Sequence, residues 1–329
     1  MKSILMTPVW LLQLVTLAKS FRANPIIGSP FLNRLGLHVV RVVLAHGLYR
    51  LRLALLAPLV PAADRKAFRA QGYLIKENFL PPEDFAKVEA EVRGFRGTVR
   101  ELREGPTVTQ RAFLDTETVA EMPACRGFLA RADLRHLLRY TSSKNRLPLV
   151  YIENLKNFGR DATEADPQRH MHSDTFHPTM KAWLFIDDVS DRNGPFTFVP
   201  GSHRLTWKRL KWEYRKSLIA RDLRDGHSED GSFRFTDADM AQLGYPAPEL
   251  LAVKPNTLVF ANTFGLHRRG AAQEPSNRLT IWFLSRDNPF SPILSPWPRL
   301  GQRINEEIVK IYARNFDRRA DNVMQGGIG

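Results

Sequence analysis

Short apolar runs bounded by turn signals mark the second half of the chain and predict β-strands. One run covers residues 256–260 and follows a lysine-proline turn signal, and another covers residues 278–284. The N-terminal region differs, because its two apolar stretches, residues 4–18 and 35–59, are longer. The pattern therefore predicts helices near the N-terminus and strands further along the chain.

One polar tripeptide, His172-Ser173-Asp174, carries the candidate chemistry. In an extended segment residues i and i+2 point to the same face, so His172 and Asp174 can bind one metal ion. His267 closely follows the apolar run 256–260 and can supply a third ligand from a strand end. Two histidines and one carboxylate on one face of a metal leave the opposite positions open, which suits Fe(II) with a co-substrate and O2. The pattern predicts an oxidative enzyme.

Arg278 begins the apolar run 278–284, where its guanidinium can face the same cavity as the metal. A planar guanidinium binds a carboxylate through two parallel hydrogen bonds. A His-x-Asp tripeptide alone is weak evidence, but His267 and Arg278 follow it in the order that such a site needs. Without them, His172 and Asp174 would be interpreted as a hydrogen-bonded pair on a solvated strand.

Further segments make the chain resemble a known family. Residues 193–203 contain Asn-Gly followed by Pro-Gly-Ser-His, Ala182-Trp183 forms an Ala-Trp step, and residues 68–80 read as a helix end followed by a strand. With the histidines and the arginine above, these segments resemble the phytanoyl-CoA dioxygenase family of Fe(II)/2-oxoglutarate oxygenases. The resemblance extends from about residue 68 to residue 284.

The resemblance implies a role for each matching residue. The metal ligands and catalytic residues would be His172, Asp174 and His267. Arg278 would bind the distal carboxylate of 2-oxoglutarate, and Trp183 would lie beside that co-substrate or be a core residue. A further contact would come from the strand within residues 149–156, in which the sequence selects no particular side chain. Family halogenases replace the carboxylate ligand, so the intact aspartate favours hydroxylation, with Fe(II), 2-oxoglutarate and O2 as cofactors and ascorbate as an auxiliary reductant.

The length of 329 residues and the 43% hydrophobic content allow one large core plus an appendage. The predicted fold is mainly β with flanking helices: a double-stranded β-helix, or cupin-like jelly roll, plus N-terminal amphipathic helices. Residues 1–62 are expected to form a basic, apolar membrane-surface segment and residues 63–329 the oxygenase domain. The single cysteine, Cys125, excludes an intrachain disulfide and is compatible with a reducing compartment.

Half of the net charge of +14 lies in the first 63 residues, which contain seven basic residues and no acidic one. Within 34–52 the basic and histidine side chains fall on about half of a helical wheel: Arg34, His38, Arg41, His46, Arg50 and Arg52. We expect them to face anionic headgroups while neighbouring apolar side chains enter the acyl boundary: Val40, Val43, Leu44 and Leu51. The alternative is a helix that packs on the oxygenase core with solvated arginines.

Neither N-terminal stretch has the sequence of a good membrane-spanning helix. The first is short and contains Pro8 and Gln13, and the second repeatedly carries charge. These interruptions also argue against an exported signal peptide, and 2-oxoglutarate is made in the cytoplasm. We therefore expect a cytoplasmic protein, peripheral on the inner face of the cytoplasmic membrane.

A second basic block, residues 204–224, has eight basic and two acidic residues. It can border the substrate entrance and attract an anion, or form a solvated helix face. Its aromatic side chains suit stacking on sugars, anchoring at an interface or core packing: Trp207, Trp212 and Tyr214. Three other histidines are weaker ligand candidates. His170 and His177 are expected at the rim or behind the ligands, and His203 in a structural turn.

The predicted function is hydroxylation of an anionic membrane lipid or glycolipid. The basic N-terminal segment looks similar to that of enzymes that hydroxylate Kdo, the acidic sugar of lipopolysaccharide, which makes Kdo the first choice of substrate. Two alternatives stay open: a hydroxylase of a soluble or carrier-linked small molecule, such as an acyl-CoA or a natural-product intermediate, and a non-catalytic jelly-roll binding protein. Nucleic acid is a weak candidate partner, because positive charge alone supports only nonspecific phosphate attraction. The sequence leaves the oligomeric state open.

Overall fold

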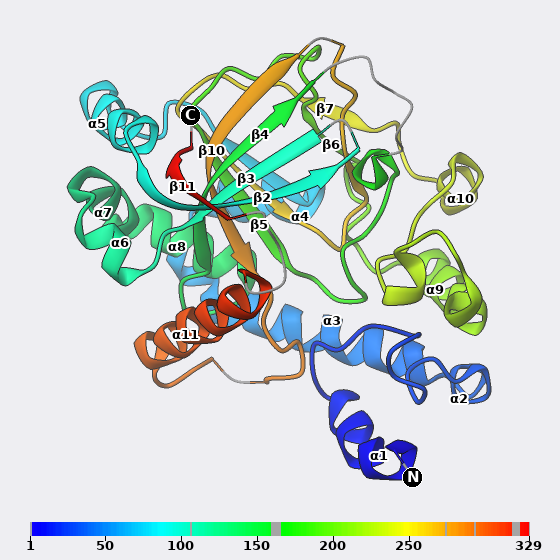
Figure 1. The fold of residues 1–329 in the computed structure, drawn as a ribbon. Coiled ribbons are helices and arrows are strands. Elements are labelled where there is room, and N and C mark those ends of the chain that lie inside the picture. The colour runs from blue at the N-terminus through cyan, green and yellow to red at the C-terminus, as the bar shows by residue number, and fades with distance from the viewer. Residues whose placement is uncertain are drawn as a thin grey trace.

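Two antiparallel sheets form the centre of the molecule (Figure 1). The computed structural model describes residues 2–105, 107–158, 166–273, 275–292, 294–317 and 323–328. Its strands are β1 Tyr73–Lys76, β2 Arg96–Glu104, β3 Thr107–Phe113, β4 Leu149–Asn157, β5 Met180–Phe185, β6 Phe196–Phe198, β7 Glu249–Leu251, β8 Thr257–Asn262, β9 His267–Arg269, β10 Ser276–Ser285 and β11 Val323–Gly327. The larger sheet has the order β1-β8-β5-β10-β4-β3-β2-β11, and the smaller has the order β7-β6-β9.

Helices flank these sheets (Figure 1). They are α1 Lys2–Gln13, α2 Pro30–Arg34, α3 Leu37–Leu56, α4 Ala62–Gln71, α5 Pro82–Arg93, α6 Thr116–Ala120, α7 Pro123–Ala130, α8 Ala132–Ser142, α9 Trp207–Ile219, α10 Asp237–Leu243 and α11 Pro298–Asp317. The mainly β jelly-roll core with flanking helices is therefore as predicted, and so are the strands expected within 149–156, 256–260 and 278–284.

Alternation along β10 separates the hydrophobic core from the cavity. Leu279, Ile281 and Phe283 belong to the main core, which also contains buried side chains of α3, α4, α5, α7 and α8. The intervening positions Arg278 and Trp282 line a cavity on the opposite face of the sheet. Because successive strand residues point to opposite faces, one strand both closes the core and builds the site.

The tripeptide 172–174 does not form the strand that its spacing predicted. His172 makes isolated bridges to Arg234 and His267, and Asp174 lies in a bend. Backbone hydrogen bonds to three other segments hold this stretch in place, including a pair that joins His172 and His267 in both directions, at 3.0 and 2.9 Å. The two side chains nevertheless point to one place, as the next subsection describes.

The expected direction of the basic and histidine side chains within 34–52 is wrong for four of the six. His38, Arg41, His46 and Arg52 of α3 are buried, whereas Arg34 at the end of α2 and Arg50 of α3 are exposed. Apolar positions of the same helix are exposed instead, including all four that were expected to enter a bilayer: Val40, Val43, Leu44 and Leu51. The helix packs on the oxygenase core, as the alternative interpretation expected, but Arg41 and Arg52 are buried and not solvated.

Internal partners explain why the polar face of α3 is buried. Arg41 donates hydrogen bonds to backbone carbonyls after α1, His38 pairs with Glu213 of α9 at 2.9 Å, and Arg52 donates to carbonyls of two distant loops. Buried charged groups are tolerated when such partners replace water. Among the described residues, segment 37–59 alone is long and apolar enough to cross a membrane, although 39% of it is buried on the rest of the protein.

Candidate active site

His172, Asp174 and His267 converge in the structure, and all three are buried. Oδ1 of Asp174 lies 3.8 Å from Nε2 of His172 and 3.5 Å from Nε2 of His267. The imidazole rings lie 4.4 Å apart between centroids. A single ion with ligand bonds of about 2.1 Å can bridge atoms at these separations. The structure thus brings together the three residues that the sequence singled out as metal ligands.

Backbone carbonyls orient both imidazoles. Nδ1 of His172 donates to the carbonyl of His170 at 2.8 Å, and Nδ1 of His267 donates to the carbonyl of Gly265 at 2.9 Å. A proton on Nδ1 leaves Nε2 as the lone-pair atom that a metal needs. Within the described residues Nε2 of His267 is buried without a hydrogen-bond partner. A metal cation satisfies this atom, so the residues present fit an iron site.

Electrostatics favour the metal-binding protonation states of His172 and Asp174. Burial, followed by the nearby His267 and Arg234, lowers the pKa of His172 well below its usual value. Burial opposes ionisation of Asp174, but Lys181 and His267 hold the pKa of this carboxyl well below its usual range. A neutral imidazole and an ionised carboxylate are the forms that coordinate a metal.

Two lysines position the aspartate. Nζ of Lys181 lies 2.8 Å from Oδ2 of Asp174, and Nζ of Lys19 donates to the backbone carbonyl of Asp174 at 2.6 Å. Lys181 lies two residues before Trp183 on β5, so both side chains point to the same face of the strand. The sequence therefore contained a signal that could have placed Lys181 in the cavity. No local sequence signal indicates Lys19, because it lies 155 residues from its partner.

Arg278 lies in the same cavity as the triad and is buried there. One of its guanidinium nitrogens donates to the carbonyl of Gly194 at 2.8 Å, and burial lowers its pKa to about 10, a value at which it remains charged at neutral pH. Trp183 also lines this cavity, with its ring 4.9 Å from that of Phe196. The sequence predicted a contact from the strand within residues 149–156 without selecting a side chain. In the structure Glu153 and Leu155 of β4 line the cavity.

The cavity has a volume of about 370 Å³ and a strongly basic lining. Three of the lining residues are acidic, Glu104, Glu153 and Asp174, and eight are basic: Lys19, Arg111, Lys181, Arg234, Arg268, Arg269, Arg278 and Arg286. Arg111 pairs with Glu153 at 2.7 Å, and Arg269 pairs with Asp166 at 2.8 Å. Within the described residues no carboxylate lies at ion-pair distance from Arg234, Arg278 or Arg286. These three side chains can therefore bind anions.

The other candidates from the sequence lie outside the metal centre. His170 is exposed and supports the site only through its carbonyl, while His177 is buried beside the neighbouring pocket. The His203 ring packs against Gly72, whose positive φ of 87° ends α4 and where a side chain would collide with the ring. His203 is therefore a structural residue, as expected.

The basic block 204–224 has a structural role near α3. None of its residues lines the cavity. Arg209 is fully buried and pairs with Glu213 at 2.9 Å, and Trp212 stacks on Phe235 with centroids 4.0 Å apart. Trp207 is exposed. Of the two alternatives for this block, the structure does not bear out the one at the substrate entrance, because Trp212 packs in a separate hydrophobic cluster and Arg209 and Glu213 pair with each other.

A jelly roll that holds a buried His-Asp-His triad and an arginine in one cavity defines the class of Fe(II)- and 2-oxoglutarate-dependent oxygenases. Residues 68–240 match the family model described as phytanoyl-CoA dioxygenase (PhyH). This match covers more than half of the chain, so the protein belongs to the phytanoyl-CoA dioxygenase family. It is accordingly an enzyme that uses iron and 2-oxoglutarate.

Solved structures show remote similarity. The epimerase SnoN, in complex with Fe3+, alpha ketoglutarate and nogalamycin RO, is 18% identical with a TM-score of 0.47, over 69% of this chain and 83% of that one. HygX from Streptomyces hygroscopicus, with nickel and 2-oxoglutarate bound, is 14% identical with a TM-score of 0.45, over 68% of this chain and 86% of that one. No curated protein matches the chain significantly. The family assignment therefore rests on the sequence match.

Proposed function

We propose that this oxygenase hydroxylates a C–H bond of an anionic, membrane-associated substrate, with the Kdo sugar of lipopolysaccharide or a lipid A precursor as the first choice. One observation carries the proposal: the cavity has more cationic groups than 2-oxoglutarate requires. Arg278 is sufficient for the distal carboxylate of that co-substrate. Lys19, Arg234 and Arg286 remain, and they suit a second anion.

The remaining cations form a cluster separate from Arg278. Lys19, Arg286 and Arg234 all interact electrostatically with Asp174 or with one another, whereas Arg278 interacts with Arg269 and Glu153. Burial lowers the pKa of Lys19 to about 8 and also lowers the pKa of Arg234, since their charges lack full hydration. A substrate carboxylate or phosphate would supply the missing negative charge.

The protein's own groups would divide the work of the reaction. When bound, iron and 2-oxoglutarate supply the oxidising chemistry that converts a C–H bond to C–OH with release of succinate and CO2. His172, Asp174 and His267 would hold the metal, and Arg278 would orient the co-substrate. Lys19, Arg234 and Arg286 would hold the substrate's anionic group so that a single C–H bond faces the metal.

The protein would act on the inner face of the cytoplasmic membrane, where 2-oxoglutarate and lipopolysaccharide precursors are both accessible. Arg34 and Arg50, which are exposed near the exposed apolar positions of the N-terminal helices, support this location through attraction to anionic headgroups. The alternative substrate class is a soluble or carrier-linked anion such as an acyl-CoA, for which the same cationic cluster would bind phosphate.

The test is anaerobic reconstitution with Fe(II), 2-oxoglutarate and ascorbate, followed by addition of O2 and measurement of succinate with and without a Kdo-containing lipid. We expect the lipid to raise succinate formation and to gain the mass of one oxygen. If acyl-CoA raises succinate formation and the lipid does not, the substrate is a soluble or carrier-linked anion and not a membrane lipid. Absence of succinate under every condition would contradict an active oxygenase and favour a binding protein.

A matched pair of variants separates substrate binding from co-substrate binding. Arg234→Gln should raise the KM for the anionic substrate by about tenfold or more, the loss expected for one charge-assisted hydrogen bond, and leave lipid-independent turnover of 2-oxoglutarate unchanged. Arg268→Gln is the control, because this exposed arginine lies at the cavity edge outside the cluster around Asp174. Equal effects of the two substitutions would contradict a specific anion site.

A further inference from the structure

Exposed apolar side chains gather on a few helices of this protein. Of the 24 large apolar side chains that are exposed among the described residues, 19 lie on or immediately beside α1, α2, α3 and α11. Figure 1 shows these four helices at one end of the molecule, away from the edge that carries β6 and β7. Monomeric soluble proteins seldom gather so many exposed large apolar side chains at one end, so a partner that covers them is expected.

Helix α3 presents an apolar row outward. The exposed positions follow helical spacing, i, i+4, i+11 and i+15: Val40, Leu44, Leu51 and Leu55. The opposite face is buried and mixed, because Tyr49 and Leu53 pack in the main core while Arg41 and Arg52 donate to backbone carbonyls. An ordinary surface helix has one apolar stripe, which faces the core, and a solvated polar face. On α3 polar side chains are buried as well, and a second apolar row is exposed.

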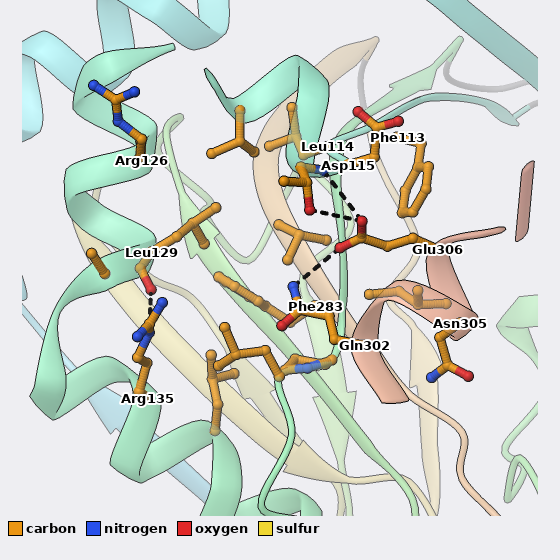
Figure 2. A pocket seen from close by; sticks show the side chains of 18 of the residues that line it. Phe113, Leu114, Asp115, Arg126, Leu129, Arg135, Phe283, Gln302, Asn305 and Glu306 are labelled. Atoms are coloured by element: carbon orange, nitrogen blue, oxygen red, sulfur yellow. Dashed lines mark hydrogen bonds between the residues drawn. The ribbon is translucent and has the colours of Figure 1, made fainter. Parts of the chain in front are cut away.

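Helix α11 also exposes an apolar row, and polar side chains lie on its inner side. On its inner side Glu306 accepts a hydrogen bond from Oγ1 of Thr116 at 2.8 Å, and Lys310 pairs with Asp115 at 2.8 Å. Figure 2 shows Glu306 and Gln302 directed into a cavity of about 360 Å³ between α11 and the sheet, with hydrogen bonds to their neighbours. On the outer side an exposed apolar row begins just before the helix: Trp297, Leu300, Ile304, Ile308 and Ile311.

A groove beside α11 leads to the candidate metal site. This groove of about 1730 Å³ is lined by Ile308 and Tyr312 of α11 and by residues of β2 and β3, and it reaches Leu17 after α1. The same groove shares five lining residues with the catalytic cavity: Leu102, Arg111, Trp282, Leu284 and Arg286. The cavity thus continues into a groove that runs along α11.

We propose that α1, α3 and α11 form a docking surface for an anionic lipid bilayer, with the catalytic groove opening towards the membrane. Charge supports a bilayer as the occupant. Exposed arginines stand among or beside the apolar rows, where anionic headgroups would lie: Arg34, Arg50, Arg299, Arg303 and Arg314. The substrate's apolar part would occupy the groove while its anionic part reaches Arg286. The location of the groove deepens the proposed function and rests on it, whereas the docking surface is independent of substrate identity.

The experiment measures binding of the full-length protein to sedimented vesicles of phosphatidylcholine with and without phosphatidylglycerol. The parent protein should bind the anionic vesicles. Leu44→Gln with Leu51→Gln, and separately Leu300→Gln with Ile304→Gln, should each weaken binding at least tenfold. Leu250→Gln on β7 is the matched control, because Leu250 is equally exposed, at 51%, and lies outside this surface. Vesicle binding that is the same for all of these proteins would overturn the proposal.

A second readout reports insertion rather than folding. Tryptophan fluorescence of the parent should be quenched by lipids brominated on their acyl chains, and Trp297→Phe should reduce that quenching, since Trp297 is 71% exposed at the start of the α11 row. Equal quenching in the parent and in Trp297→Phe would remove α11 from the surface. A dimer that the glutamine variants dissociate, without any vesicle binding by the parent, would identify a second copy as the occupant and also overturn the proposal.

Lipid-independent turnover of 2-oxoglutarate distinguishes this inference from the proposed function. The glutamine variants lie outside the catalytic cavity and should retain that turnover. Turnover without vesicle binding would leave the oxygenase intact and contradict the docking surface. Vesicle binding without turnover would support the surface and contradict the proposed reaction.

Discussion

Arginines are buried in two regions of this molecule, and their surroundings differ. On α3, the guanidinium of Arg41 donates to three backbone carbonyls, those of Leu14, Thr16 and Ala18. In the catalytic cavity, Arg278 donates to one carbonyl among the described residues, that of Gly194. A guanidinium has five N–H donors, so the first is largely satisfied by the protein and the second has donors to spare. The comparison teaches that burial alone does not identify a functional arginine, whereas burial with unused donors indicates a ligand site.

The largest effect should come from the metal ligands, on which the catalytic side of the comparison depends. His172→Ala should lower iron affinity and succinate formation by more than about 100-fold, which is the upper range for loss of a residue that only orients a metal ligand. His170→Ala is the control, because the site uses only its backbone carbonyl. Iron stoichiometry and succinate assays measure both. Parent-like iron binding by His172→Ala would contradict the assignment of the triad.

The spare donors of Arg278 make the next prediction. Arg278→Gln should raise the KM for 2-oxoglutarate by about 100-fold, because about 3 kcal/mol of charge-assisted hydrogen bonding is lost. Arg234→Gln, in the other cationic cluster, should leave this KM within about twofold. Steady-state kinetics with varied 2-oxoglutarate decide the matter. If Arg234→Gln has the larger effect on this KM, the roles of the two clusters are reversed.

A satisfied arginine should affect stability and not catalysis. Arg52→Met should lower the free energy of unfolding by about 2 to 3 kcal/mol, since buried carbonyls that lose their donor cost about 1 to 3 kcal/mol each. These carbonyls belong to Ser143, Pro289 and Ser291. Arg50→Met, at an exposed position of the same helix, should change stability by less than about 0.5 kcal/mol. Urea unfolding measures the stability of both variants. If Arg52→Met raises the KM for 2-oxoglutarate without loss of stability, Arg52 has a catalytic role and the distinction between satisfied and unsatisfied arginines is wrong.

The smallest predicted effect concerns acid. Burial, followed by nearby cationic groups, lowers the pKa of His46 on α3 well below the usual value of 6.5. Below pH 6.5 the unfolded chain binds this proton and the folded chain does not, so stability falls as pH decreases, by about 1.4 kcal/mol per pH unit for one histidine. His46→Leu should therefore show a smaller loss of stability than the parent between pH 6.5 and 5.5. Identical losses in urea unfolding would show that His46 titrates normally.

The sequence predicted most of the residues that converge in the candidate metal site because the relevant information is local. His172 and Asp174 are two residues apart, and the period-2 pattern of β10 places Arg278 and Trp282 on one face. The prediction of a regular strand at 172–174 failed without moving the ligands, since tertiary hydrogen bonds to His267 hold the same arrangement. Residue spacing, rather than strand formation, was the reliable signal.

Sequence patterns could not predict the cationic cluster of Lys19, Arg234 and Arg286. Lys19 and Asp174 are separated by 155 residues, and Arg234 lies on an irregular segment that bridges to His172. Arg286 lies an even number of residues after Arg278 and Trp282. Of the three cationic residues in the cluster, it was the one that the period-2 strand pattern could place on the cavity face. The basic block 204–224 looked like a stronger candidate because charge density is visible in sequence, while its burial in a separate cluster is not.

What the sequence by itself determined is the family and a set of two histidines, an aspartate and an arginine that one cavity brings together. The tertiary structure alone decided which side chains of α3 face inward. A helical wheel gives the angular position of each residue, but the buried side depends on partners that local sequence does not contain. Glu213 and the carbonyls that meet Arg41 and Arg52 come from other segments, and they satisfy polar groups that are buried together with the apolar side chains of α3 in the core.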